Sequence, residues 1–160
     1  MATPARLAGV GVFVVSGVCL FTVGLFMIGD RQMAFAKKFT ISTEFKKITG
    51  LQPGSIHGFH VHDVGNCASA DFMSAGNHFN PTHKPHGPQD HPHHAGDMPS
   101  LLADPSGKID ARFTLEGVTL GGADGFVGHS VILHATADNF DAQPSGNSGA
   151  RIACGVIAAQ

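Results

Sequence analysis

The 160-residue sequence has few charged residues, few cysteines and none of the larger aromatic residues. Only 14% of its residues are charged, three are cysteine, and neither tryptophan nor tyrosine occurs. A net charge of −2 and an isoelectric point near 6.6 lack the basic excess typical of nucleic-acid-binding domains, so we expect no nucleic-acid partner. The length allows one ordinary domain with an appendage and excludes two full domains.

Glycine and histidine are the residues present in excess, with 21 and 11 copies. Abundant glycine among short apolar runs favours a loop-rich β fold over a helical bundle. Nearly all the histidines lie between His57 and His94, so they form a local signal rather than a general bias.

The three cysteines leave two interpretations open. Cys19 lies inside an apolar run and is expected to be inert packing. A bond between Cys67 and Cys154 would close a long loop and would require an oxidising compartment. Spacing alone favours this pair no more than two free thiols.

An uncharged apolar segment covers residues 7–29, which is 23 residues. At about 1.5 Å per residue it would cross a hydrocarbon core of about 30 Å, so residues 1–36 are predicted to be a membrane anchor. Its length favours an uncleaved anchor, although Ala34 to Ala36 has the form of a signal-peptide cleavage site. Flanking basic residues would keep the following part inside, whereas a disulfide needs it outside. We give the disulfide and metal chemistry more weight.

Residues 37–54 read KKFTISTEFKKITGLQPG, and the alternation from Phe39 to Glu44 predicts a half-buried strand near 38–46. With the preceding apolar segment, residues 6–54 resemble the start of a mammalian-cell-entry (MCE/MlaD-type) lipid-transport protein, through its anchor, strand and GL-x-x-G turn. That resemblance implies recruitment to a lipid-transfer assembly as one alternative function.

His60 and His62 stand two residues apart in GFHVH, within a second predicted strand over 56–62. On a strand, side chains at i and i+2 share one face, so both imidazoles can reach one ion. A polar strand face is the alternative to metal binding when the motif stands alone.

The stretch that follows is rich in glycine, proline and asparagine and predicts a long ordered loop. It contains His78, His86, His94 and Asp97. Three imidazoles and one carboxylate make a closed tetrahedral shell suited to structural zinc. A histidine-rich tract that chelates metal loosely is the alternative, and it would also include His83, His91 and His93.

His134 ends the apolar run in VILHATAD, where a strand would present a ligand. Four imidazoles from His60, His62, His78 and His134 would form a nitrogen-rich site suited to Cu(II). Copper carries single electrons and zinc has no redox chemistry, so the pair of sites indicates electron transfer to a small species.

The segments GFHVHDVGNC, SAGNHFNP, PHGP, HHAGD, VILHATAD and GNSGARIACGVI resemble, in order, the signature segments of copper/zinc superoxide dismutases. The resemblance covers about residues 54–160, and the interval from Cys67 to His78 is similar to that of the bacterial periplasmic branch. It implies an all-β Greek-key barrel or sandwich over residues 37–160. It also implies Cu(2+) and Zn(2+) as cofactors and a location on the periplasmic side of the inner membrane, or free in the periplasm after cleavage.

The same resemblance implies a role for each matched residue. Copper would bind His60, His62, His78 and His134, and zinc would bind His78, His86, His94 and Asp97, so that His78 bridges the two metals. Cys67 would pair with Cys154, Asp138 would link a copper ligand to a zinc ligand, and Arg151 would guide the anionic substrate. The implied reaction converts superoxide to dioxygen and hydrogen peroxide, with His78 delivering a proton. A homodimer is a further expectation.

The resemblance leaves the barrel incomplete, because the family has three strands before the one that carries H-x-H. The interval between the anchor and His60 has room for two strands at most, so we predict a truncated barrel with open edges. A fusion at the shared GL-x-x-G turn explains this arrangement. Beside the lipid-transfer component, we therefore keep two further alternatives to the enzyme: a copper- and zinc-binding module without turnover, and an inactive fusion or truncation product.

Overall fold

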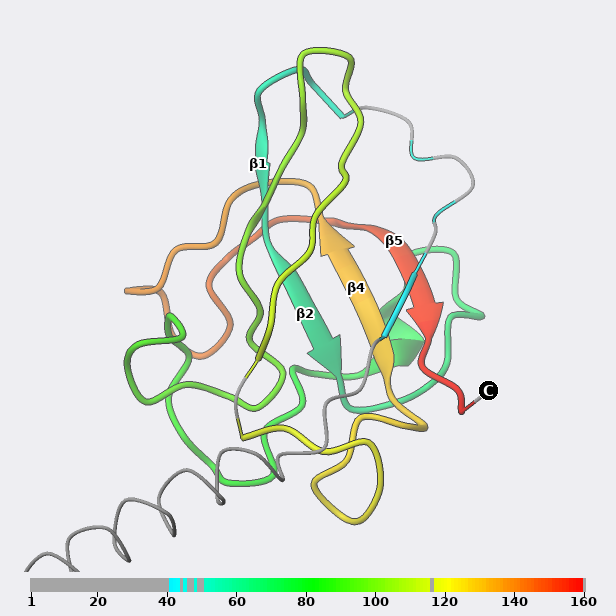
Figure 1. Cartoon of the computed structure of the whole chain (residues 1–160), viewed down its shortest axis with the longest axis vertical. Coiled ribbons are helices and arrows are strands. Elements are labelled where there is room, and N and C mark those ends of the chain that lie inside the picture. The colour runs from blue at the N-terminus through cyan, green and yellow to red at the C-terminus, as the bar shows by residue number, and fades with distance from the viewer. Residues whose placement is uncertain (1–40, 44, 46–47, 49–50, 116, 160) are drawn as a thin grey trace, which may run out of the picture. The chain divides into compact units, whose positions relative to one another are not determined.

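The computed structural model describes residues 41–43, 45, 48, 51–115 and 117–159 (Figure 1). The predicted anchor over residues 1–36 lies outside them, and so do Lys38 to Thr40 of the predicted first strand. Within the described residues, no helix is long and apolar enough to cross a membrane.

Five strands and one short 3-10 helix are the regular elements of the described residues. In chain order they are β1 (Ile56–His57), β2 (Phe59–His62), η1 (Met73–Ala75), β3 (Leu101–Leu102), β4 (Ser130–His134) and β5 (Arg151–Val156). The described part of the chain has no α-helix, which confirms the prediction of an all-β fold.

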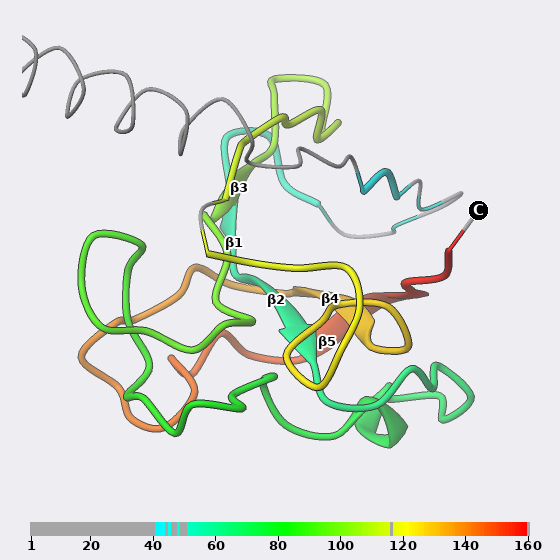
Figure 2. The same cartoon turned by 60° about the horizontal axis from the view of Figure 1, so that its bottom comes forward.

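The strands form two antiparallel sheets. The larger sheet has the order β2-β4-β5, and the smaller is the ribbon β1-β3. In the larger sheet Val61 stands opposite Val131 and Ile132 opposite Cys154, and the register shifts between Leu133 and His134. Figure 2 shows the green loop after β2 running below the sheet and then beside the orange loop between β4 and β5 at the left of the view.

The predicted strand over 56–62 is interrupted at Gly58, which divides it into β1 and β2. The Gly58 amide donates to Thr136 O rather than to β3, so the chain changes partner there. A Cβ at Gly58 would lie 2.6 Å from Ser148 Oγ, which explains the absence of a side chain.

The described part of the predicted strand near 38–46 has no strand pairing: Ile41 to Thr43 are not in a ladder. The segment nevertheless passes β5, because a Cβ built at Gly155 would lie 3.2 Å from Thr43 Oγ1 and 3.6 Å from a ring carbon of Phe45. Phe45 packs on the core, so side-chain contacts help to hold the described residues of this segment.

The two faces of β2 have different surroundings, although all four of its residues are buried. Phe59 and Val61 join the apolar core, which also contains Val131 and Leu133 of β4. His60 and His62 point to the opposite face, since side chains alternate along a strand. The loops that cover this second face therefore decide the surroundings of the histidines.

Candidate metal centre

Three backbone hydrogen bonds form a closed triangle between one residue of β2 and two residues of the loop that follows β2. Val61 N donates to Gly96 O (2.8 Å), Gly96 N donates to Phe79 O (2.9 Å), and Phe79 N donates to Val61 O (2.8 Å). Each of these residues is a chain neighbour of predicted ligands: Val61 separates His60 from His62, Phe79 follows His78, and Gly96 precedes Asp97. The triangle therefore brings three distant ligand-bearing segments together through the backbone.

The first group of imidazoles consists of His60, His62, His78 and His134, all buried. One ring nitrogen from each lies within 4.8 Å of the others. These are the four residues that the sequence predicts as copper ligands.

Hydrogen bonds fix which nitrogen of each ring is free. His62 Nδ1 lies 2.9 Å from Gly76 O, and His134 Nδ1 lies 3.2 Å from Gly149 O. A carbonyl only accepts, so both Nδ1 atoms carry the proton and both Nε2 atoms keep a lone pair. His62 Nε2 and His134 Nε2 are buried without a hydrogen-bond partner, and so is His60 Nδ1. Unpaired buried nitrogens are costly, and a bound cation would satisfy them.

The second group surrounds the carboxylate of Asp97. Its Oδ1 lies 3.1 Å from Nδ1 of His78, 3.0 Å from Nδ1 of His86 and 3.2 Å from Nδ1 of His94. Its Oδ2 accepts hydrogen bonds from the amides of Gly87 and His94. The four side chains predicted as zinc ligands thus meet at one point, and His78 belongs to both groups.

His60 also falls within 4.8 Å of His78, His86 and Asp97, because its ring stacks on that of His78 with centroids 3.9 Å apart. Its Nε2 is already bonded to Asp138, 2.8 Å away. Only Nδ1 of His60 is free, and we count His60 with the first group.

Asp138 connects the two groups, as the sequence predicts. Its Oδ2 accepts from His60 Nε2 at 2.8 Å and lies 3.2 Å from His86 Nε2. A carboxylate shared in this way orients one imidazole of each group.

Burial and charge favour the metal-binding form of the first group and of the two carboxylates, but not of His86. Burial lowers the pKa of His62 to about 2 and those of His78 and His134 to about 4, so these imidazoles are neutral at neutral pH. Burial opposes ionisation of Asp97 and Asp138, but hydrogen bonds from the histidines outweigh it and lower the pKa of both carboxyls. At His86 burial is likewise outweighed by hydrogen bonds to Asp138 and Asp97, which raise the pKa to about 9. His86 is therefore protonated when no metal is bound, whereas the neutral imidazoles of the first group and the ionised carboxylates of Asp97 and Asp138 suit a cation.

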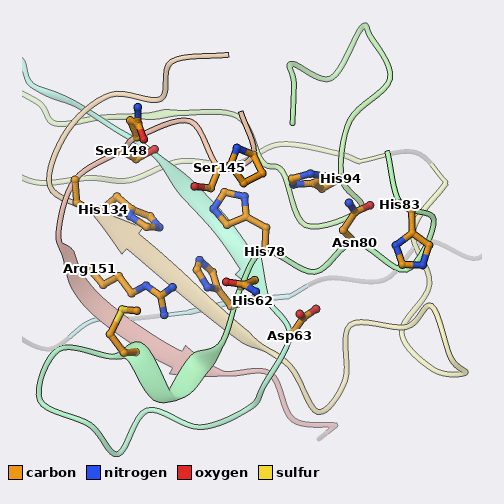
Figure 3. A pocket seen from close by; sticks show the side chains of 15 residues that line it. His62, Asp63, His78, Asn80, His83, His94, His134, Ser145, Ser148 and Arg151 are labelled. Atoms are coloured by element: carbon orange, nitrogen blue, oxygen red, sulfur yellow. Dashed lines mark hydrogen bonds between the residues drawn. The ribbon is translucent and has the colours of Figure 1, made fainter. Parts of the chain in front are cut away.

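Arg151 lies at the pocket that opens on the first group. Its guanidinium donates to Phe72 O (2.8 Å) and Gly76 O (2.7 Å), which holds it in place. Figure 3 shows it beside His62, His78 and His134 around the pocket.

Cys67 and Cys154 form a disulfide across a sequence separation of 87, and this bond ties the loop after β2 to β5.

The remaining loop histidines stay outside both groups. His91 is exposed and pairs with Asp90, and His93 contacts the carbonyl of His91. His83 is exposed and lines the pocket mouth. If the tract chelated metal loosely, all its histidines would have similar exposure. In the structure the predicted ligands are buried, whereas His83 and His91 are exposed.

Three supporting residues were not predicted from the sequence. Buried His57 contacts His134 O through Nδ1 (2.8 Å), Gln143 bonds both backbone groups of His86, and Ser148 donates to Asp138 Oδ1 (2.6 Å). The sequence could have indicated His57, because this residue is the first in the histidine-rich stretch. Gln143 stands in none of the signature segments, and Ser148 lies in GNSGARIACGVI without a ligand-type side chain, so neither role could be found without the fold.

The profile of the copper/zinc superoxide dismutase (SODC) family matches residues 32–157. The chain belongs to this family. A curated relative, the superoxide dismutase-like protein YojM of Bacillus subtilis (strain 168), is 42% identical over 114 residues, which are 67% of this chain and 58% of the relative. The chain therefore spans little more than half the length of that relative.

Solved structures give the same fold. A double mutant of a SOD-like protein from Bacillus subtilis matches with a TM-score of 0.61 and 42% identity, covering 68% of this chain and 75% of that one. The clock protein EA4 matches with a TM-score of 0.61 and 35% identity, covering 65% and 70%. The resemblance of residues 6–54 to an MCE-type protein stays a prediction.

Proposed function

We propose that this chain is a superoxide dismutase that converts two superoxide ions and two protons to dioxygen and hydrogen peroxide. His60, His62, His78 and His134 would hold copper, and His78, His86, His94 and Asp97 would hold zinc. The observation that carries the proposal is the set of buried imidazole nitrogens without hydrogen-bond partners in these two groups. Bound copper supplies the one-electron redox couple, and bound zinc supplies fixed positive charge.

Arg151 is suited to bind the substrate anion. A guanidinium stays protonated and offers paired donors to a small anion. Two of its donors are engaged by the carbonyls of Phe72 and Gly76, so it presents the rest to the pocket from a fixed position.

His78 is suited to deliver a proton to the product. Its Nδ1 faces Asp97, which leaves Nε2 for the first group. A proton held at Nε2 would pass to the reduced oxygen species, and Asp97 would keep the ring oriented during the transfer.

We further propose that the domain faces the periplasm, tethered by the apolar segment over residues 7–29. The Cys67–Cys154 disulfide supports this location, because such bonds persist in oxidising compartments. Protease treatment of intact spheroplasts would degrade the domain in this orientation and spare it in the opposite one.

Pulse radiolysis of the full chain loaded with copper and zinc tests the activity. We expect superoxide decay far faster than with free copper, and a loss of at least about 100-fold in His134→Ala, since a ligand should matter more than its outer-sphere partners. Equal decay for both proteins, no faster than free copper, would contradict the proposal.

A metal-binding module without turnover is the second candidate. The exposed imidazoles of His83 and His91 favour it, because they offer surface ligands beside the buried groups. It predicts uptake of both metals by the full chain with no acceleration of superoxide decay, so the same experiment separates the two.

A further inference from the structure

The hydroxyl of Ser148 is the donor that sets the orientation of the Asp138 carboxylate. Ser148 is 3% exposed, and its Oγ donates to Asp138 Oδ1 at 2.6 Å. The Asp138 side chain is itself 1% exposed. Within the described residues, no other side-chain hydrogen bond reaches Oδ1.

The two oxygens of Asp138 therefore have separate partners. Oδ1 faces Ser148, while Oδ2 faces His60 Nε2 (2.8 Å) and His86 Nε2 (3.2 Å). Rotation of the carboxylate about its Cβ–Cγ bond would exchange or misalign these oxygens. A donor on Oδ1 opposes that rotation, so it keeps Oδ2 between one imidazole of each group.

Two glycines make room for this arrangement. A Cβ at Gly58 would lie 2.6 Å from Ser148 Oγ, so a larger residue there would displace the hydroxyl. Gly146 has φ +73°, and a Cβ there would overlap Asp138 Oδ1 and lie 2.6 Å from His86 Nε2. Both positions need glycine because the hydroxyl, the carboxylate and the imidazole occupy the space.

The backbone around Ser148 is fixed by the sheet. Thr136 N donates to Ser148 O, and Gly58 N donates to Thr136 O, so Ser148 is linked to the beginning of β2. It lies on the same side of the pocket as His134 (Figure 3). The main chain that carries the hydroxyl is thus held independently of the carboxylate.

We infer that Ser148 is a positioning residue that acts through Asp138 on both metal groups. The inference rests on the proposed function for the identity of the metals, and it concerns their binding rather than turnover. Loss of the hydroxyl leaves Oδ1 buried without a donor, which frees the carboxylate to rotate or to recruit water. Both His60 and His86 then lose a fixed partner.

The test compares Ser148→Ala with the wild-type full chain by chelator competition for Cu(II) and Zn(II) and by Cu(II) electron paramagnetic resonance. We expect the affinity for both metals to fall about 10-fold, as for other outer-sphere partners of ligating histidines, with an altered copper spectrum. The matched control is Ser106→Ala. Its hydroxyl also donates to an aspartate at 2.6 Å (Asp104 Oδ1), but on an exposed loop, and its removal should change neither affinity nor spectrum.

A second background separates positioning from a general structural role. In Asp138→Ala, removal of the Ser148 hydroxyl should produce no additional loss of affinity, because its target is gone. A further loss of several-fold there would overturn the inference, and so would wild-type affinities and spectrum in Ser148→Ala. A chain that binds both metals normally but fails to accelerate superoxide decay would overturn the proposed function. The comparison of metal affinities between the wild type and Ser148→Ala would still test the inference.

Discussion

The histidine face of the β2-β4-β5 sheet and the β1-β3 ribbon differ in how their side chains are covered. On the histidine face, six imidazoles and the Asp97 carboxylate are buried, with exposures of 0 to 7%. On the ribbon, Ile56 and Leu102 stand opposite each other in register, yet they are 49% and 62% exposed. Polar groups are thus enclosed while an apolar pair is open to solvent, the reverse of ordinary burial preferences.

This difference shows that the two regions are held together by different interactions. The ribbon consists of two residue pairs, and two-stranded ribbons are marginal by themselves. The histidine face is held by backbone bonds and a disulfide, and it carries the two groups of proposed metal ligands. Its stability should therefore depend on metals and on oxidation, whereas that of the ribbon should depend on neither.

Removal of both metals should give the largest effect. Two sites, each filled at about 1,000 times its dissociation constant, stabilise the native state by about 8 kcal/mol together. Chelation should therefore lower the free energy of unfolding in urea by that order. Hydrogen exchange should show the loss of protection concentrated in residues 77–98, with little change at 101–103. Equal loss in both regions would contradict the comparison.

Loss of the disulfide should come next. Cys154→Ser opens a loop with a sequence separation of 87, and chain entropy predicts a loss of about 4 to 5 kcal/mol in the free energy of unfolding. Urea titration of oxidised wild type against the variant measures it, with reduced wild type as the control. A loss below about 1 kcal/mol would show that this bond does not constrain the unfolded chain in solution.

Replacement of one zinc ligand should have a smaller and more local effect. His86→Ala removes a nitrogen that faces Asp97 and is expected to lower Zn(II) affinity by at least about 100-fold. Cu(II) affinity should fall much less, since His86 is not one of the four imidazoles of the first group. His91→Ala is the control, because His91 is exposed and should leave both affinities unchanged. Equal effects of the two variants would favour loose chelation.

The open apolar pair should give the smallest effect. Replacement of Leu102 by threonine introduces a β-branched residue suited to a strand and should change the free energy of unfolding by less than about 0.5 kcal/mol, as is usual at exposed sites. Urea titration measures it. A loss above about 1.5 kcal/mol would show that Leu102 is covered in the intact protein. The ribbon would then not be the exposed region that the comparison requires.

Local patterns in the sequence predicted the all-β class and the members of the two ligand groups, because each ligand lies in its own short segment, such as H-x-H on a strand. The Cys67–Cys154 bond was predicted only through the family resemblance, since spacing alone left that pairing open. The division of the strand over 56–62 at Gly58 was missed, since the reason is contact with Ser148, ninety residues later in the sequence. The absence of strand pairing at Ile41 to Thr43 was also missed, because alternation predicts a pleated conformation and does not supply a partner.

The hydrogen-bond triangle of Val61, Phe79 and Gly96 bears on how such a site can change over evolutionary time. Its donors and acceptors are peptide groups, so they are independent of which side chains stand next to them. Ligand positions can then be exchanged or lost one at a time while the three segments stay in place. A module of this kind can also persist when distant strands are replaced.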